Sequence, residues 1–432
     1  MGIFDWFRGR RASEAFDFDE AVAVDALTPA RIDHGLRDFP GFQESANMRP
    51  ARGAKAAARQ RMRAAFSPAN PISDVTMFAG RREVLVQMIR AIEDRRFHLV
   101  LYGDRGIGKT SMLHVLSYLA RQAGYLVRYT SCSEGADFSQ TFRTIARDIP
   151  IIYHNAIEPT SELVERGATL ADLLPDGDLT ATQISELFAN VTGTRVLIVL
   201  DEFDRSDSVE FRRWTAELIK NLSDRSTRVQ LVIAGVAGNL NELIEHIPSI
   251  RRNIFCLPVP SMTDKEIEDI IEIGAQTSGV GYQPSARAQI VGLANGSPYL
   301  ANLIGQHAGL AALDRGAESV SAADVQVALE RALYEIEQRV PPKALYQLKH
   351  MSDPGLRAAL ERAAKEALTS IGRIEAPAPG DTHRAAELDR LASEFRLIED
   401  TPEAPGAAYR FIEDGVALYL WLTSAARDLK KR

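Results

Sequence analysis

The chain has 432 residues, enough for two or three domains, and its hydrophobic content of 45% and charged content of 25% are ordinary for a globular protein. The formal net charge of -7 excludes a uniformly basic surface of the kind that binds nucleic acid. Cys132 and Cys256 lie far apart, and no apolar run approaches the roughly 20 residues that span a bilayer. We therefore expect a cytoplasmic protein with no structural zinc site and no integral membrane insertion.

Residues 1–66 differ in composition from the rest of the chain, and we expect a variable, flexible tail there. Within it, segment 49–63 has no acidic residue and carries Arg49, Arg52, Lys55, Arg59, Arg61 and Arg63. This pattern is typical either of a basic helix that contacts phosphates or of a solvated linker helix. The turn-rich residues 67–71 mark the boundary to the next domain.

The most informative stretch is a strand, a glycine-rich loop and a helix. Residues 97–102 predict a short buried strand, and residues 111–119 carry apolar side chains at helical spacing. Between them, residues 103–110 fit the pattern G-x-x-x-x-G-K-[ST], whose backbone N–H groups and helix N-terminus bind phosphate. Lys109 would supply a point charge for the outer phosphates and Thr110 a hydroxyl ligand for Mg²⁺. The predicted phosphate site comprises Gly103, Asp104, Arg105, Gly106, Ile107, Gly108, Lys109, Thr110 and Ser111.

An acidic pair follows a second buried strand. Residues 196–200 form the unbroken apolar run of a parallel strand that is covered on both faces. Asp201 and Glu202 come next, at the carboxyl end, where open parallel sheets place their ligands. Asp201 would hold Mg²⁺, and Glu202 would orient or deprotonate the attacking water. The alternative for Glu202 is a helix N-cap or a surface carboxylate.

Further strands are predicted at 125–130, 229–234 and 254–257, and a mostly helical piece at 133–190. The alternation of strands and helices predicts an α/β fold, with a parallel sheet and helices on both of its faces. We assign residues 67–258 to this core.

The strands stop near residue 258. Residues 259–340 are predicted to form an all-helical lid, which opens on a capping box of Thr263 and Glu266. In residues 341–432, helical segments are followed by two short strands, which indicates a winged-helix-like domain.

Five features follow one another along the chain in a recognisable order. They are the segments FAGRREVL, GDRGIGKTS and LIVLDEFD, the pair Arg251 and Arg252, and the turn Gly296-Ser297-Pro298. The order resembles that of AAA-type P-loop ATPases of the initiator and archaeal-ATPase groups, which are relatives of the STAND switch ATPases.

The resemblance covers residues 67–340 and the winged-helix-like end. It implies a P-loop NTPase core with a helical lid subdomain, binding ATP or ADP with Mg²⁺. It also implies that Gly80 and Arg81 frame the adenine and that Pro298 lies near the phosphates. Arg251 or Arg252 would reach the nucleotide of a neighbouring subunit in a homo-oligomer, and the alternative is a pair of surface arginines.

Two departures from the family pattern favour a slow nucleotide-dependent switch over a steady motor. The polar residue expected near 235–237 is missing, with Asn239 as the nearest candidate, and the helix after Pro298 begins without an arginine. The alternative is a nucleotide-stabilised DNA-binding or signalling adaptor without significant turnover. Candidate partners beyond ATP are DNA, through the winged helix or segment 49–63, and an unidentified protein.

Overall fold

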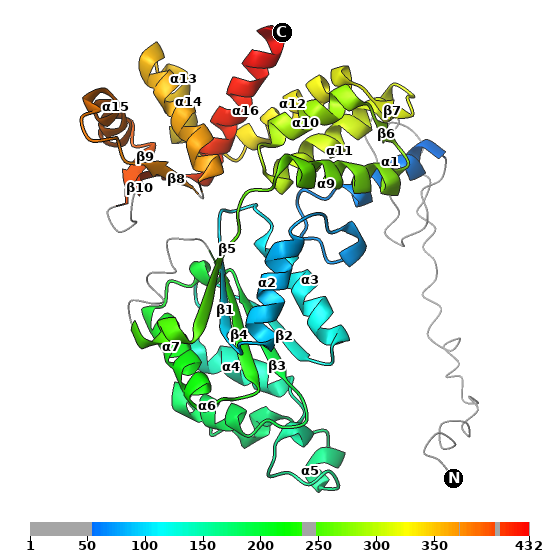
Figure 1. Ribbon diagram of the computed structural model, residues 1–432, viewed down its shortest axis with the longest axis vertical. Helices are drawn as coiled ribbons and strands as arrows, with labels where there is room; N and C mark the ends of the chain where they lie inside the picture. Colours follow the sequence, from blue (N-terminus) through cyan, green and yellow to red (C-terminus); the bar gives the residue numbers. More distant parts are fainter. Residues whose placement is uncertain (1–53, 236–247, 371, 402–406, 432) are drawn as a thin grey trace, which may run out of the picture. The chain divides into compact units, whose positions relative to one another are not determined.

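The computed structural model describes residues 54–235, 248–370, 372–401 and 407–431 (Figure 1). Its core is a five-stranded sheet in the order β2-β3-β4-β1-β5. All neighbouring pairs are parallel, as the sequence predicts. The strands are β1 His98–Tyr102, β2 Leu126–Ser131, β3 Val196–Asp201, β4 Val229–Gly235 and β5 Ile254–Pro258.

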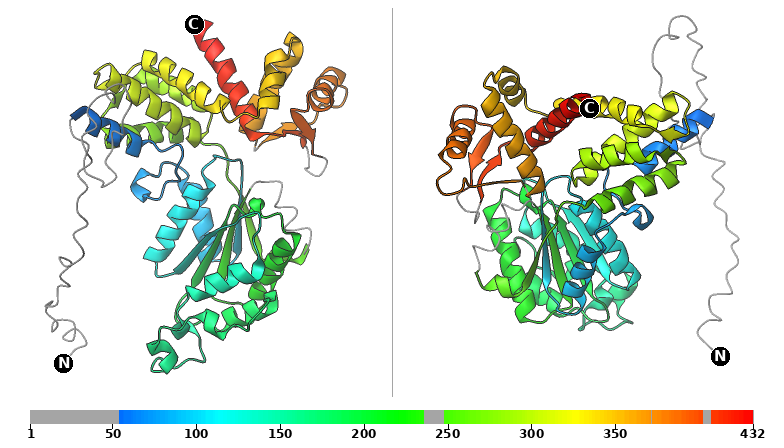
Figure 2. Two further views of the ribbon diagram at one scale, coloured as in Figure 1. Left: turned by 180° about the vertical axis from the view of Figure 1, so that it is seen from behind. Right: turned by 45° about the horizontal axis from the view of Figure 1, so that its top comes forward.

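Helices cover both faces of this sheet (Figure 2). Alternate residues of β3 point to opposite faces. Leu197 and Val199 therefore pack with helices α2 and α3, whereas Val196, Ile198 and Leu200 pack with α4, α6 and α7. The bounds are α2 Arg82–Glu93, α3 Lys109–Gln122, α4 Phe138–Arg147, α5 Glu162–Glu165, α6 Ala181–Ala189 and α7 Val209–Asp224. Because β3 is covered on both faces, all of its residues are buried, including the terminal Asp201.

The next part of the chain is a helical lid with its own apolar core. The predicted capping box of Thr263 and Glu266 is present at the start of its first helix. The lid is not wholly helical, because a two-stranded ladder joins the turns after its first and third helices. Its elements are α9 Asp264–Ser278, β6 Gly281–Tyr282, α10 Pro284–Ala294, α11 Pro298–Asp314, β7 Ser319–Val320 and α12 Ala322–Glu337.

Part of the expected N-terminal tail belongs to the lid. Helix α1 (Ala54–Ala65) packs on α9 and α11, and Met62 and the following Phe66 are fully buried there. Burial of two such side chains contributes about 2–3 kcal/mol each. Over its described residues, segment 49–63 is thus a basic helix, but it is not a solvated linker, because its apolar edge packs in the lid. Residues 1–53 lie outside the described part of the chain.

The C-terminal part combines helices with a three-stranded antiparallel sheet in the order β8-β10-β9. Strand β8 was not predicted, because a strand of three residues is too short to show an alternation of apolar and polar side chains. The last helix runs on to Lys431 and packs in two cores, with Leu420 in the C-terminal core and Leu422 in the lid core. The elements are α13 Pro342–His350, α14 Pro354–Thr369, β8 Arg373–Glu375, α15 Thr382–Ser393, β9 Ile398–Asp400, β10 Ala407–Phe411 and α16 Asp414–Lys431. No helix within the described ranges has the length and apolar character needed to cross a membrane.

The α11–α12 turn of the lid is fixed by a buried carboxylate. Both oxygens of Asp324 accept hydrogen bonds of 2.8 Å from Arg315, and the backbone N–H of Ser321 donates to Asp324 at 2.7 Å. These donors, Arg315 foremost, lower the pKa of the Asp324 carboxyl to about 2. A lowered pKa means that the ionised group stabilises the folded lid.

We expect Asp324→Asn to lower the free energy of unfolding by about 2 kcal/mol at neutral pH, because the ion pair is lost. In the wild type, the same stabilisation is present above about pH 4 and disappears as the pH falls toward 2. Urea titrations followed by circular dichroism at several pH values measure both effects. The matched control is Asp269→Asn in α9, whose pair with Lys265 is exposed and should contribute little to the free energy of unfolding. Equal losses in the two variants would contradict the role given to Asp324.

Candidate functional site

The glycine-rich loop joins β1 to α3. Gly106 and Gly108 have φ angles of +78° and +98°, in the left-handed region that favours glycine. Gly103 is held close to the sheet, where an added Cβ would lie 3.1 Å from the carbonyl oxygen of Val259. The loop therefore needs glycine at all three positions, and its shape follows from the residues that fit the pattern.

The Lys109 ammonium lies inside this loop. It donates hydrogen bonds to the carbonyl oxygens of Gly103 at 2.7 Å and Asp104 at 2.8 Å. Burial lowers the pKa of Lys109, and the carboxylates of Asp204, Asp104 and Asp201 act in the opposite direction. The arrangement holds a cation where an anionic ligand would meet it.

Asp201 is fixed at the carboxyl end of β3. One of its oxygens accepts from the Tyr129 hydroxyl at 2.5 Å, and the other accepts from the backbone N–H of Glu202 at 2.8 Å. Burial raises the pKa of Tyr129, and the bond to Asp201 raises it further, so the phenol remains a donor. Because two donors bind this almost fully buried carboxylate, they fix its orientation. Asp201 also lines the cavity described below.

Glu202 has a positive φ of 52° and a more exposed side chain. One of its carboxylate oxygens accepts from Arg205 at 2.8 Å and from the Ser131 hydroxyl at 3.0 Å. The hydrogen bond from Arg205 is the largest cause of its lowered pKa. Glu202 is thus an ionised carboxylate held in an exposed pair, whereas Asp201 is buried and fixed.

A cavity of about 260 Å³ brings most of the predicted residues together. Its walls are the loop, the carboxyl end of β3, residues 67–72 and the first turn of α11. The predicted site residues among its lining are Arg105, Gly106, Gly108, Lys109, Thr110, Ser111, Asp201, Glu202 and Pro298. Gly103 and Asp104 stand behind this lining, where their carbonyls hold Lys109.

A second cavity of about 40 Å³ adjoins the first, because Ile72, Ser111 and Pro298 line both. Its lining is mostly apolar and includes Ile107 and Arg81. Gly80, with a φ of +66°, lets the chain turn so closely that an added Cβ would clash with Glu266 at 2.7 Å.

Arg81 provides a test of whether these residues fit a nucleotide. Its side chain is buried, and neither terminal nitrogen has a hydrogen-bond partner. Burial lowers the pKa of Arg81 to about 10, although Glu266 acts against the shift. Buried donors without acceptors are costly. The acceptor atoms of a base or ribose in this apolar slot would satisfy them, so the residues fit the group.

The predicted magnesium ligands fit a Mg²⁺ ion only when a nucleotide is bound as well. Thr110 and Asp201 line the same cavity. Among the described residues, no group of three or more His, Cys, Asp or Glu side chains gathers as a metal site. Mg²⁺ normally takes one or two protein ligands together with phosphate oxygens and water, which is the donor set available here.

Arg251 and Arg252 do not join the cavity. They are exposed at the end of a short 3₁₀ helix, η7 (Pro248–Arg252), just before β5. Because Ile254 pairs with His98 in a parallel ladder, this is the amino end of the strands, whereas the loop follows their carboxyl ends. Asn239 lies outside the described residues.

Sequence reasoning missed several residues that line the cavity, namely Asp204, Arg205, Tyr299, Asn302 and residues 67–72. Asp204 and Arg205 directly follow the acidic pair in the chain, and Tyr299 follows Pro298, so proximity was an available signal. The Tyr299 ring packs over Gly106, and its hydroxyl accepts from Arg339 at 2.7 Å. Nothing in the sequence indicated that residues 67–72 would form a wall.

Comparison with solved structures finds neighbours of low similarity. Cdc6p from Pyrobaculum aerophilum is 17% identical with a TM-score of 0.46, covering 85% of this chain and 98% of that chain. The ORC2 protein of Aeropyrum pernix, in ADPNP–ADP complexes, is 17% identical with a TM-score of 0.45, covering 86% and 98%. The RuvB branch migration motor of Thermotoga maritima is 16% identical with a TM-score of 0.43, covering 83% and 97%. Likenesses this low carry no argument about what the chain does.

The family comparison is more specific. No curated protein matches the chain. Residues 77–233 match the family model described as "AAA ATPase domain". The matched range contains Arg81, the glycine-rich loop and the acidic pair, which the structure places around two adjoining cavities. Residues 77–233 therefore form an AAA-type P-loop ATPase domain.

Proposed function

We propose that the chain binds Mg-ATP in the larger cavity and hydrolyses it slowly, acting as a nucleotide-dependent switch. One observation carries this proposal: a single cavity gathers the phosphate loop, the acidic pair and the first turn of the lid helix α11. We also propose domain boundaries near residues 258 and 340, with α1 assigned to the lid.

Each group has a distinct role in this mechanism. Lys109 and the loop N–H groups neutralise the charge on the outer phosphate oxygens, and Arg81 donates to the base or ribose. Thr110 and Asp201 would hold Mg²⁺, which when bound supplies further positive charge to the phosphates. Glu202 orients the attacking water and accepts its proton, because its side chain is more exposed than the buried Asp201 beside it.

The pairing of Glu202 supports slow turnover. Arg205 and Ser131 both donate to one of its carboxylate oxygens, and the bond from Arg205 lowers the pKa of Glu202, so the carboxylate is a weaker base for the proton of water. The first turn of α11, Pro298-Tyr299-Leu300, brings no arginine of its own to the phosphates. If turnover is absent and purified protein carries stoichiometric ADP, the adaptor alternative is favoured instead.

If Arg251 or Arg252 acts on a nucleotide, that nucleotide belongs to a second copy of the chain. They lie at the opposite end of the strands from the loop of their own chain. We therefore propose a homo-oligomer that forms with ATP and in which one of these arginines reaches the neighbouring site.

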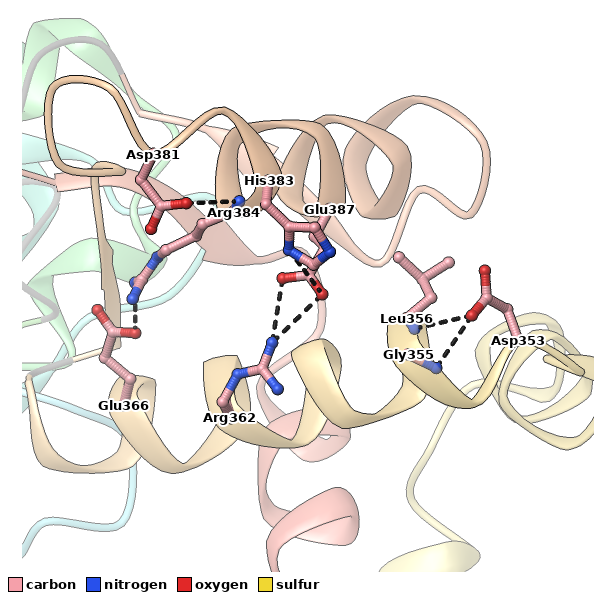
Figure 3. Close-up of polar contacts among 9 residues, drawn as sticks. All are labelled: Asp353, Gly355, Leu356, Arg362, Glu366, Asp381, His383, Arg384 and Glu387. Atoms are coloured by element: carbon pink, nitrogen blue, oxygen red, sulfur yellow. Dashed lines mark hydrogen bonds and ion pairs between the residues drawn. The ribbon is translucent and has the colours of Figure 1, made fainter.

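DNA reading through the C-terminal domain is disfavoured by its charges. Helix α15 would be the groove-reading helix of a winged-helix domain, yet each of its basic residues has a carboxylate partner. Arg384 pairs with Glu366 at 2.8 Å, His383 with Glu387 at 3.6 Å, and Arg390 with Asp353 at 3.1 Å (Figure 3 shows the first two). Glu387 also accepts from Arg362, as the close-up shows.

The described part of segment 49–63 is engaged as well. Arg59 pairs with the Asp314 carboxylate of the lid, and Lys55 donates to the backbone carbonyl oxygen of the same residue. Cations that are already paired release fewer counterions when they meet phosphate, so they add less to the affinity for DNA. A protein-docking role for the winged-helix-like domain fits these pairs better.

We expect Glu202→Gln to bind ATP with wild-type affinity and to hydrolyse it at least about 100-fold more slowly, because the amide cannot accept the proton of water. Lys109→Ala should bind ATP too weakly to saturate, because the loop loses its cation. Isothermal titration and phosphate release measure these effects, with Lys265→Ala on the exposed side of the lid as the control. Wild-type turnover in Glu202→Gln would show that the residue has another role.

We expect an assembly larger than a monomer with ATP and a monomer with ADP or no nucleotide, measured by size exclusion with light scattering. The double variant R251A/R252A should still assemble but hydrolyse about 10³-fold more slowly, the effect typical of a missing arginine finger. A monomer under all three conditions would rule out the action of these arginines in trans.

We expect no saturable binding of a 25-base-pair duplex below about 10 µM protein at about 150 mM salt, with or without ATP. Fluorescence anisotropy at several salt concentrations measures this. Tight, salt-sensitive binding would contradict the charge argument for α15. Its loss in R49A/R52A would assign the contact to segment 49–63 instead.

A further inference from the structure

The segment that precedes the ATPase domain is anchored in the lid by two buried side chains. The Phe66 ring and the Met62 side chain fill a cradle that three glycines leave open on α9 and α11. An added Cβ at Gly274 or Gly305 would lie 2.1 Å or 2.7 Å from the Phe66 ring, and one at Gly309 would lie 2.3 Å from Met62. The cradle thus has the shape of these two side chains.

Residues 67–72, which we call the strap, leave this anchor and cross to the ATPase domain. The backbone carbonyl of Phe66 accepts a hydrogen bond from Gln306 of α11 at one end. At the other end, the N–H of Ile72 donates to the Ser111 hydroxyl at 3.0 Å. Pro68 and Pro71 fix their own φ angles and limit the conformations between the two ends. The strap is therefore short, stiff and held at both ends.

Every residue of the strap lines the larger cavity, and Ile72 lines the smaller one as well. Helix α11 connects the two features. Its first turn, with Pro298 and Asn302, lines the cavity, and Gly305 lies seven residues beyond Pro298, about 10 Å along the axis. The same helix thus contacts the nucleotide cavity and the anchor of the strap.

We propose that Phe66 and Met62 are positioning residues that hold the strap as a removable wall of the nucleotide site. The strap covers the bound nucleotide and sets how long it stays, and a shift of α11 withdraws the anchor. This inference rests on the proposed nucleotide site, and it adds to that site an element that precedes residues 77–233, the range of the family match.

The test is the rate at which the full-length protein releases a fluorescent ADP, N-methylanthraniloyl-ADP, when it is chased with excess ADP. Gly305→Ala puts a methyl group where the Phe66 ring lies, so the strap should detach and release should be about 10-fold faster, as is usual for effects on dissociation. The matched control is Gly292→Ala on the lid helix α10, where an added Cβ meets no atom within 4 Å. It should release at the wild-type rate.

Two further variants separate positioning from damage to the lid. Phe66→Leu in the Gly305→Ala background makes room for the methyl group and should return the rate to within about 3-fold of the wild type. The double variant P68G/P71G loosens the strap without touching the lid core. This double variant should also release the fluorescent ADP faster than the wild type. If Gly305→Ala does not fold, the release rate of P68G/P71G tests the role of the strap.

The outcomes are distinct. Wild-type release from folded Gly305→Ala and from P68G/P71G would overturn the role of the strap and leave the nucleotide site intact. If the wild type binds no fluorescent ADP and does not differ from Lys109→Ala, then the proposed nucleotide site fails and the strap proposal fails with it. Fast release from Gly305→Ala, with rescue by Phe66→Leu, supports the anchor.

Discussion

The parallel register of the central sheet is the constraint on which the site depends. Leu99 of β1 and Val199 of β3 both pair with Val232 of β4, so the loop after β1 and the acids after β3 emerge at the same edge. No direct bond between the loop and Asp201 is needed, because the ladder of β4 sets the distance. The full burial of β3 then makes Asp201 a fixed group, while Glu202, one residue further, lies beyond the strand with a partly exposed side chain.

The parallel sheet, and the arrival of the glycine-rich loop and the acidic pair at one edge of it, could be predicted because each element carries a local signal. Each pattern, whether an apolar strand, the glycine-rich loop or the acidic pair, spans only a few consecutive residues. The parallel topology of the sheet then brings these segments together. The pairing of Arg205 with Glu202 was not predictable, since an exposed arginine three residues from a glutamate is common and the positive φ of Glu202 aims its side chain. The burial of Arg81 without partners was equally invisible, because an arginine in a sequence gives no sign of what covers it.

The N-terminal boundary shows where composition misleads. Helix α1 is rich in alanine and basic residues, which suggested a tail, yet Met62 and Phe66 are the residues that decide its place. Their partners are glycines in α9 and α11, separated from them by more than 200 residues, and a glycine within a helix is usually counted as a weakness. Only the folded structure shows that these glycines leave room for the side chains of Phe66 and Met62.

The last helix has a mechanical consequence. Leu422 of α16 packs in the lid core, and the indole of Trp421 donates to the carbonyl of Leu293 at 2.9 Å, while Leu420 and Val416 pack in the C-terminal core. The helix has 18 residues, which gives a rod of about 27 Å. A rotation of about 10° at one end of such a rod displaces the other end by about 5 Å. The lid and the C-terminal domain are thus joined along one helix, so any tilt of that helix moves groups in both cores together.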